Sequence, residues 1–439
     1  RYSFLGIDPF MVFQSTGKEA FFASSTKGWE NFEVKKDPLD TLKTLMSGFR
    51  VAEIPHLPIF FGGAVGYIGY DVVKFWEKVP SLSRKDLEFP DCFFMFTRCV
   101  LVFDHLDHRI KIISFAFLDE GSVRRVYKDA VDRIEGIISI LKRKPSSEAF
   151  FPVEGKKCFD VKSNFKADDF INSVKTAKNY IKEGDIFQVV LSQRFEKKTV
   201  APPFAIYRVL RSLNPSPYMY FLRCADFYIV GSSPEVLVRK EGDEVILRPI
   251  AGTRPRGREE KEDEFLAREL LNNPKEKAEH LMLVDLGRND LGRVCKYGTV
   301  KVRELFSVEK YSHVMHLVSE IRGKLKEGKD GFDLLRACFP AGTVSGAPKV
   351  RAMQIIEELE PTARGPYAGA LGYFSFSGNM DTCIVIRTII LKENTAYIQA
   401  GAGIVADSNP EAELRETQNK AKALISAINL CEEGSGWLW

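Results

Sequence analysis

The sequence predicts an α+β fold, in which hairpins of antiparallel strands are combined with separate groups of amphipathic helices. Two observations lead to this class. Strand-like segments follow one another across tight turns, as antiparallel hairpins do, and helical segments cluster instead of alternating regularly with single strands. The chain also shows no internal repeat with a period of about 20–50 residues. Its 439 residues, at about 150 residues per domain, favour two or three domains.

Strands dominate the first third of the chain. Segments 93–103 and 109–117 are rich in aromatic and β-branched residues and flank a turn at 104–108, so we expect a hairpin here. Apolar residues in segment 120–143 recur with a period of about 3.6, which predicts one amphipathic helix.

A candidate domain boundary follows that helix. Segment 142–163 contains two prolines and clustered charges but no hydrophobic period. We therefore expect a smaller N-terminal domain over residues 1–158 and a larger domain over residues 159–439.

The larger domain has a denser pattern of helices and strands. Its expected elements follow from hydrophobic period, turn residues and helix caps. They are a helix over 168–182 ended by Gly184, a strand over 186–195, two strands around a turn at 241–243, helices from 259 to about 286 with a break at 273–274, a meander of strands over 367–376, 381–392 and 395–406, and a last helix from 410 to about 430. The start of the last helix is well marked, because Asn409 is a good cap and Pro410 suits the first helical position.

Composition excludes several classes of protein. Lys and Arg total 63 and Asp and Glu total 59, so the net charge of +4 is too even for binding nucleic acid through bulk basicity. The longest apolar stretch, residues 57–70, is too short to span a bilayer and contains four glycines. We therefore expect neither a nucleic acid nor a membrane as partner.

The cysteines and the start of the chain favour a cytoplasmic protein. Eight cysteines form no CxxC pair and lie mostly in apolar runs, which predicts buried free thiols in a reducing compartment. The first residues lack the pattern of a signal peptide. The chain also has no GxSxG nucleophile elbow or comparable cysteine turn, so we expect no amide hydrolase activity of its own.

Two pairs of acids form the sharpest local pattern. Glu276 and Glu279 follow one Asn-Pro dipeptide, and Glu413 and Glu416 follow another. Residues three apart share a helix face, so each pair projects two carboxylates in one direction. Four carboxylates on two converging helices can bind a hard cation such as Mg²⁺. The alternative, which spacing alone favours, is that acids are simply common near helix N-termini.

Glycine-rich strand ends supply a second pattern. Segment 250–257 carries a Gly-Thr pair and two arginines at a strand exit, and the expected meander contains Tyr367, Arg387 and the glycines of 401–403. Backbone N–H groups together with an arginine fork can receive a carboxylate. Ordinary turn chemistry explains each of these residues equally well when it is taken alone.

Six longer segments carry a specific resemblance: 249–257, 279–294, 314–325, 342–354, 381–388 and 399–424. Together they resemble the chorismate-utilising enzymes, and within them most closely the family of anthranilate synthase component I. The resemblance is strong over residues 160–430 and more diffuse before residue 150. It implies large mixed and antiparallel sheets sandwiched with helices, a catalytic chorismate-binding domain over 159–439, and a regulatory part over 1–158.

Two positions discriminate between branches of the family. The resembling aminodeoxychorismate synthases typically carry a nucleophilic lysine where this chain has Ala251, which cannot attack a substrate. Isochorismate and salicylate synthases carry a lysine that activates water where this chain has Gln188, and a neutral amide cannot serve as that base. Both departures leave ammonia as the incoming nucleophile.

The resemblance assigns roles to residues of this chain. As metal ligands it implies Glu279 and Glu416, with Glu276 and Glu413 in the same Mg²⁺ site. As substrate-binding residues it implies Gly252, Thr253, Tyr367, Arg387, Gly401, Ala402 and Gly403. As catalytic positions it implies Glu235, His316, Thr343 and Gln188. Glu235 would protonate the departing 4-hydroxyl, so we expect it to be buried with a raised pKa. His316 and Thr343 would lie beside the enolpyruvyl group.

The implied activity is that of a Mg²⁺-dependent carbon–carbon lyase in the first committed step of tryptophan biosynthesis. Ammonia adds at C2 of chorismate as the 4-hydroxyl leaves, and loss of the C2 proton and of pyruvate then gives anthranilate. The implied partner is a separate glutamine amidotransferase subunit that supplies the ammonia, because no glutaminase nucleophile is recognised in this chain.

A feedback site for tryptophan is also implied. Pro217, Tyr218 and Met219 match one half of it, and the other half is expected upstream of Arg1. We therefore expect weakened or absent inhibition by tryptophan for this polypeptide.

Overall fold

The computed structural model describes residues 1–24, 29–33, 37–52, 54–144, 160–311 and 314–433. They fall into two compact units. The first consists of Arg1–Gly66, Cys92–Phe151 and Gly372–Met380, and the second of Tyr67–Asp91, Pro152–Leu371 and Asp381–Trp439. The expected domain boundary after residue 158 lies outside the described residues.

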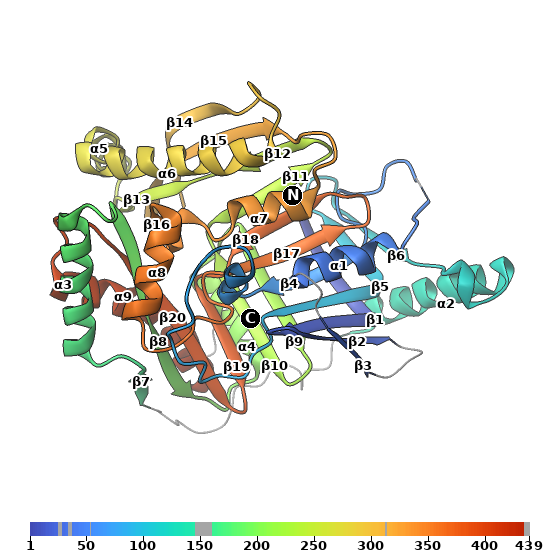
Figure 1. Cartoon of the computed structure of the whole chain (residues 1–439). Coiled ribbons are helices and arrows are strands. Elements are labelled where there is room, and N and C mark those ends of the chain that lie inside the picture. Colours follow the sequence, from blue (N-terminus) through green and yellow to red (C-terminus); the bar gives the residue numbers. More distant parts are fainter. Residues whose placement is uncertain (25–28, 34–36, 53, 145–159, 312–313, 434–439) are drawn as a thin grey trace. The chain divides into compact units, whose positions relative to one another are not determined.

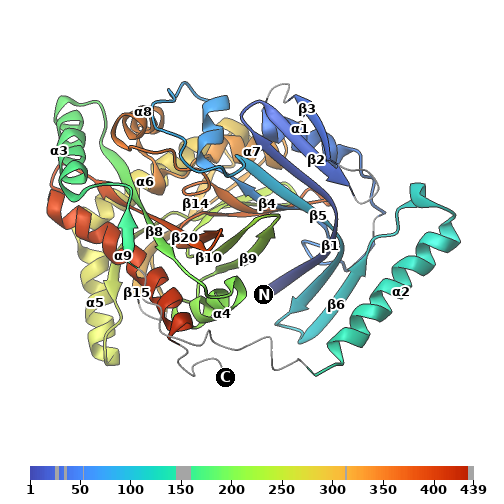
Figure 2. The same cartoon turned by 90° about the horizontal axis from the view of Figure 1, so that it is seen from below.

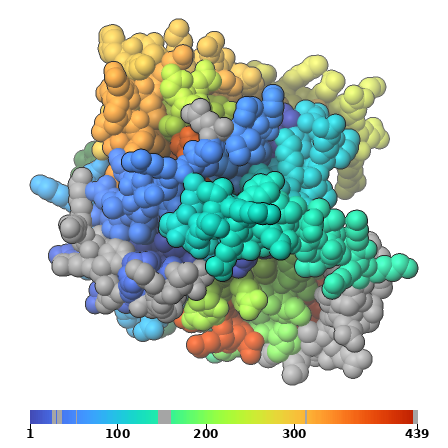
Figure 3. All heavy atoms as spheres, turned by 90° about the vertical axis from the view of Figure 1, so that its right-hand side faces the viewer, coloured from blue at the N-terminus to red at the C-terminus, as the bar shows by residue number. Residues whose placement is uncertain are grey.

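The first unit is built on an antiparallel sheet that includes the order β4-β5-β1-β2-β3, with β6 also paired to β5. Its elements are β1 (Tyr2–Thr16), β2 (Glu19–Ser24), β3 (Trp29–Glu33), α1 (Pro38–Ser47), β4 (Gly63–Ile68), β5 (Cys92–Asp104), β6 (Arg109–Ser114), η2 (Leu118–Glu120) and α2 (Val123–Leu141). The expected hairpin and the helix after it are confirmed as β5, β6 and α2. Many side chains of α2 are exposed, and Figure 3 shows this helix in teal on the face turned to the viewer.

The second unit contains a smaller sheet with the strand order β16-β8-β20-β19-β10-β9, and β7 also pairs with β8. Its strands are β7 (Val161–Ser163), β8 (Gln188–Lys198), β9 (Tyr218–Cys224), β10 (Phe227–Ser233), β16 (Gly346–Ala347), β19 (Thr388–Lys392) and β20 (Thr395–Ile404). The helices packed with this sheet are α3 (Ala167–Glu183), α4 (Pro203–Leu213), α8 (Lys349–Leu359) and α9 (Pro410–Glu432). Figures 1 and 2 both show α3 and α9 beside β8 and β20.

The two faces of this smaller sheet differ in chemistry, because side chains alternate along a strand. Leu191 of β8 and Ile398 and Ile404 of β20 belong to the apolar clusters formed with α3, α4, α8 and α9, and we call this side the helix-covered face. Ser192 and Gln399 occupy alternate positions and hydrogen-bond to each other at 2.8 Å. Their side, which we call the polar face, also carries the glycines of β20.

The rest of the second unit contains part of a larger sheet. The strands of this part have the order β13-β15-β12-β11-β18, and β14 is paired to β15. Its strands are β11 (Val236–Glu241), β12 (Glu244–Leu247), β13 (Ile250–Pro255), β14 (Lys301–Lys310), β15 (Val314–Lys324) and β18 (Met380–Ile384). Its helical segments are η1 (Tyr70–Phe75), α5 (Glu260–Asn272), α6 (Pro274–Val294), α7 (Gly331–Cys338) and η4 (Gly342–Val344). A further strand, β17 (Ala370–Ser375), contributes residues to both units, as do β4 and β18.

Two expected elements differ from the structure. The single strand expected over 381–392 is two strands, β18 and β19, which belong to different sheets. The chain leaves the strand conformation between them, and Arg387 takes a left-handed φ of 51°. Helix α6 also continues past the end expected near residue 286, because Leu291 and Val294 keep its apolar face buried. Of the helices that the structure describes, none has the length and apolar character needed to cross a membrane.

Candidate active site

A buried carboxyl group lies at the junction of the two sheets of the second unit. Glu235 sits between β10 and β11 and is 8% exposed. The Thr343 hydroxyl donates a hydrogen bond to its Oε1 at 2.9 Å, and its carbonyl oxygen accepts one from the Ile384 amide at 3.0 Å. Burial raises the pKa of Glu235 from 4.5 to about 8, although Thr343 and the charge of Lys420 both oppose this rise. The expected burial and raised pKa are confirmed, and a carboxylic acid is thereby kept protonated near neutral pH.

A small cavity lies beside this acid. Its volume is about 30 Å³, and Glu235, Thr343, Leu283, Leu286 and Asp290 are among its lining residues. A space of this size holds about one water molecule.

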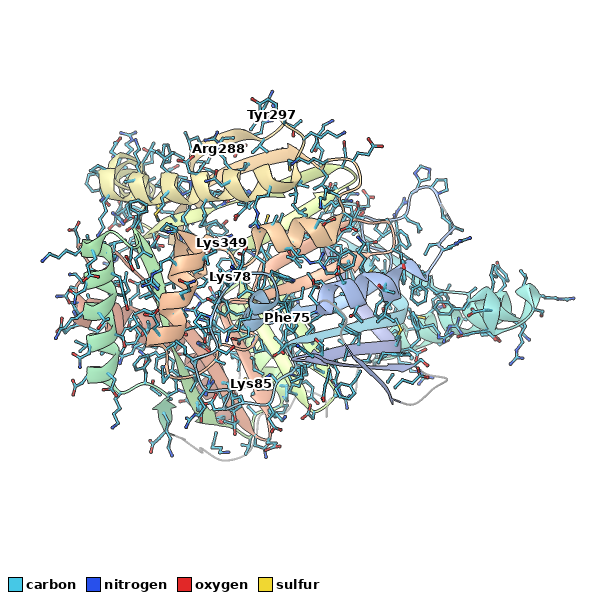
Figure 4. The ribbon with its side chains drawn as sticks, viewed as in Figure 1. Phe75, Lys78, Lys85, Arg288, Tyr297 and Lys349 are labelled. Atoms are coloured by element: carbon cyan, nitrogen blue, oxygen red, sulfur yellow. The ribbon has the colours of Figure 1, made fainter. Side chains whose placement is uncertain are left out.

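The cavity wall is fixed by an ion pair between two helices. Lys349, labelled in Figure 4 at the start of α8, donates a hydrogen bond to Asp290 of α6 at 2.7 Å. This contact joins α6, the helix that carries two of the candidate metal ligands, to the start of α8.

His316 lies on β15 next to Gly252 and Thr253 of β13. Its Nδ1 is 2.9 Å from the Gly252 carbonyl oxygen and 3.1 Å from the Thr253 hydroxyl. Since a carbonyl oxygen can only accept, Nδ1 carries the proton and Nε2 keeps its lone pair. Burial lowers the pKa of His316, so the ring is neutral at pH 7. The sequence-predicted residues Gly252, Thr253 and His316 are therefore brought together.

The first turns of α6 and α9 bring the four predicted acids into electrostatic range of one another. The pKa of Glu279 is raised first by burial and then by the charge of Glu276, with further contributions from Glu413 and Glu416. The pKa of Glu413 is likewise raised by burial and by Glu416, against a lowering hydrogen bond from Ser408. Mutual repulsion of half-buried carboxylates is relieved when a cation binds between them.

The chemistry of this set fits Mg²⁺, which prefers carboxylate oxygens. Among the described residues, however, no three His, Cys, Asp or Glu side chains are already placed to hold a metal ion. Two of the acids are instead paired with cations of the chain: Glu276 with Arg254 at 3.0 Å, and Glu416 with Lys420 at 2.7 Å. A bound metal ion would compete with these two ion pairs.

An open pocket of about 450 Å³ lies against α9. Arg387, Ala412, Arg415, Glu416, Asn419 and Lys420 line it. The Nζ atom of Lys420 also donates to the carbonyl oxygen of Gly401 at 2.9 Å, so this lysine joins the acids to the glycine-rich strand. Sequence reasoning missed Lys420, although its position four residues after Glu416 places it on the same helix face.

The glycines of β20 leave room for two polar side chains on the polar face. A β-carbon on Gly401 would lie 2.8 Å from the Tyr367 hydroxyl, and one on Gly403 would lie 2.6 Å from Nε2 of Gln188. Oε1 of Gln188 is buried and has no hydrogen-bond partner among the described residues. The predicted residues Gln188, Tyr367, Gly401 and Gly403 therefore meet on the polar face. By contrast, the side chain of Ala402 lies in the apolar core of the helix-covered face, so only its backbone borders the site.

The residues predicted to form one half of a feedback site for tryptophan lie elsewhere in the second unit. Tyr218 begins β9, and its hydroxyl donates to Asp381 at 2.8 Å. Met219 is paired across the ladder with Ser232. Within the part of the chain that the structure describes, no hydrogen bond or ion pair links Pro217, Tyr218 or Met219 to the four acids.

The close approach at Gly403 gives a testable prediction. In Gly403→Ala the new methyl group displaces the flexible Gln188 amide, and we expect kcat/KM for the site's substrate to fall about 10- to 100-fold, as small misplacements of reacting groups do. The melting temperature should hardly change, because a side chain rather than backbone moves. Gly292→Ala on α6 is the control, since a β-carbon there meets nothing within 4 Å. Turnover by Gly403→Ala that equals the unmodified chain would mean that Gln188 does not face the substrate.

Comparisons with known proteins show the family to which the chain is similar over nearly its full length. The family model described as chorismate binding enzyme matches residues 1–426. Anthranilate synthase component 1 of Acetivibrio thermocellus is 52% identical over 432 residues, which are 98% of this chain and 87% of that protein. The same component of Aquifex aeolicus is 50% identical over 407 residues, covering 93% and 82%. The crystal structure of anthranilate synthase component I from Streptococcus pneumoniae matches with a TM-score of 0.86 and 40% identity, covering 97% of this chain and 92% of that one.

Proposed function

The chain belongs to the chorismate-binding enzyme family, and from this premise we propose that it is a lyase that converts chorismate and ammonia into anthranilate. The observation that carries the proposal is Glu235, a buried acid whose pKa of about 8 lets it donate a proton at neutral pH. Thr343 holds one carboxyl oxygen by donating to it, so the proton resides on the other oxygen, which is free to face a leaving hydroxyl.

The first half of the reaction needs an acid and a nucleophile. Glu235 gives its proton to the 4-hydroxyl as the C4–O bond breaks, water leaves, and ammonia forms the new bond at C2. The amide oxygen of Gln188 has no hydrogen-bond partner among the residues that the structure describes, so it can accept from an N–H of ammonia. Ala251, at the position of the family's nucleophilic lysine, forms no covalent bond to the ring, so ammonia is the group that remains.

The second half removes the C2 proton and breaks the C3–O bond, releasing pyruvate and leaving an aromatic ring. His316 is neutral and its Nε2 carries the lone pair of the ring, so it can hold a proton in this step. Its orientation is fixed through Nδ1 by Gly252 and Thr253. Arg387, which lines the open pocket, and the backbone of the β20 glycines receive the carboxylates of the substrate.

The four acids of α6 and α9 would hold Mg²⁺. When bound, the cation supplies a positive charge that holds the ring carboxylate of chorismate and offsets the charge of the acids. Glu279 and Glu416 are the proposed direct ligands, with Glu276 and Glu413 in the surrounding shell.

We infer two further properties of the protein. Its relatives are named as component 1, which supports a second component, and we propose a glutamine amidotransferase subunit that delivers ammonia. Each of the seven cysteines that the structure describes is a buried free thiol, which supports a reducing, cytoplasmic location.

The test is an assay of the chain alone with chorismate, ammonium and Mg²⁺. We expect anthranilate to appear by its fluorescence, and we expect none when ammonium is left out, because the nucleophile is then missing. Product identity is checked by chromatography. Accumulation of 4-amino-4-deoxychorismate or isochorismate in place of anthranilate would overturn the proposal and assign the chain to another branch of the family.

A further inference from the structure

One buried arginine touches several of the segments that build the site. Arg364 lies in the loop between α8 and β17, and its side chain is 2% exposed. It donates to the Val344 carbonyl at 2.7 Å, to the Val190 carbonyl at 2.7 Å, and to both carboxylate oxygens of Glu360 at 2.6 and 2.9 Å. A guanidinium group has a planar fork of five donors, so it can bind several acceptors at fixed angles.

Each of these contacts leads directly to a site residue. Val344 follows Thr343, whose hydroxyl holds Glu235. Val190 lies on β8 opposite Gly403 of β20.

Glu360 continues the connection along β8. Its Oε1 accepts from the backbone and hydroxyl of Ser192 at 2.8 and 2.9 Å. Ser192 in turn lies opposite Gly401. Arg364 and Glu360 thus hold the two residues of β8 that lie opposite Gly403 and Gly401 of β20.

Two aromatic rings complete the surroundings. The guanidinium carbon lies 5.6 Å from the centre of the Tyr367 ring and 4.7 Å from that of Tyr70. Cation–π attraction strengthens where water is excluded, so it holds the Tyr367 ring near Gly401. Burial opposes the charge of Arg364, but Glu360 and the tyrosines keep its pKa above the ordinary value.

We propose that Arg364 is a positioning residue that sets the mutual geometry of Thr343, Tyr367 and the glycine strand, and that the rate of the reaction depends on this geometry. The inference rests on the proposed function. Burying a charge is costly, and apolar side chains often stabilise a core as well as a buried ion pair does. A requirement to bond η4, β8 and the carboxylate of Glu360 simultaneously explains why a guanidinium stands here.

The chain provides a matched control for a role in stability alone. Lys197 of β8 and Glu432 of α9 form a buried ion pair at 2.7 Å, with side chains 2% and 4% exposed. Lys197 lies on the same strand as Val190 and Ser192, whereas its partner Glu432 lies on α9 and is not one of the predicted site residues. Lys197→Met therefore reports what breaking a buried ion pair does to folding by itself.

The experiment compares Arg364→Lys with Lys197→Met and the unmodified chain in the anthranilate assay. A lysine keeps the charge but lacks the planar fork that bonds Val344, Val190 and Glu360 at fixed angles. We expect kcat to fall about 10- to 100-fold with less than about a threefold change in KM. We also expect the basic limb of the rate profile to move to higher pH, because a loosened Thr343 lowers the pKa of Glu235 less. Lys197→Met should lower the melting temperature without either change.

Chemical rescue separates position from folding. In Arg364→Ala, added guanidinium at millimolar concentration should restore part of kcat, whereas equal sodium chloride should not. An unchanged kcat and pH profile in Arg364→Lys, with only a lower melting temperature, would overturn the inference.

A measurement that does not depend on turnover distinguishes a failure of the inference about Arg364 from a failure of the proposed function. The pH dependence of the melting temperature is compared between each protein and its Glu235→Gln version, and the difference reports the pKa of Glu235. An upward move of that pKa in Arg364→Lys supports positioning even if no anthranilate forms, and an unmoved pKa contradicts it.

Discussion

Replacing Glu279 by glutamine is expected to abolish measurable turnover, with kcat/KM lowered by more than about a hundredfold. Substitutions in the shell around a metal ligand already cost about 10- to 100-fold in metal affinity, and a direct ligand contributes more. Glu279 is half-buried, and each of the other three acids raises its pKa. Its charge is therefore unfavourable in the ion-free protein and becomes favourable only when a cation offsets it.

Melting temperatures test the same assignment without turnover. Mg²⁺ should raise the melting temperature of the unmodified chain, because a ligand that binds the folded state stabilises it. In Glu279→Gln this rise should shrink, while the melting temperature without Mg²⁺ should increase, since a repelling charge is gone. Glu264→Gln, in an exposed ion pair with Arg268 on α5, is the control and should behave like the unmodified chain. Near-normal turnover in Glu279→Gln would contradict the metal assignment.

Glu235→Gln is expected to lower kcat by about 10²- to 10⁴-fold, which is the usual contribution of a general acid. The amide has the same shape and can still accept from Thr343, but it has no proton to give. In the unmodified chain, turnover should decline as the pH rises through about 8, because the acid then ionises. The rate profile of each protein over pH 6–10 measures both effects. A kcat within threefold of the unmodified chain would rule out Glu235 as the acid.

The same variant should gain stability in alkaline solution. The pKa of Glu235 is about 8 in the folded chain, against 4.5 ordinarily. Its contribution to the free energy of unfolding is thus fully present below about pH 4.5, declines as the pH rises, and is lost above about pH 8. Glu235→Gln removes this loss, so its advantage in melting temperature should grow from pH 5 to pH 8 and then level off. A constant difference would mean that the acid is not buried in solution.

Local signals in the sequence predicted local structure well. Helix α9 begins at Pro410, and the Asn409 side chain accepts from Ala412 as a cap should. Asn273 caps α6 in the same way. Capping depends on residues within one turn, so the sequence contains the whole signal.

Features that depend on distant segments could not be predicted in this way. The spacing of Glu413 and Glu416 indicates a shared helix face, but not that α6 lies opposite. The division of 381–392 into strands of two sheets depends on which neighbours each strand finds. Arg364 lies in an unremarkable loop, and only its partners in β8 and η4 reveal what it holds together. The residue types of the site could thus be named from family resemblance, while their supports could not.

The alternation along β8 and β20 has a practical consequence for protein engineering. Side chains on the helix-covered face pack with α3, α4, α8 and α9, so we expect substitutions there to act mainly on thermal stability, whereas the proposed site residues Gln188, Gly401 and Gly403 belong to the polar face. A library restricted to the first set can be screened for thermal tolerance alone, with little risk of altering selectivity. A library over the second set can be screened for altered chemistry provided that Ser192 is kept, because its backbone and hydroxyl hold the buried carboxylate of Glu360.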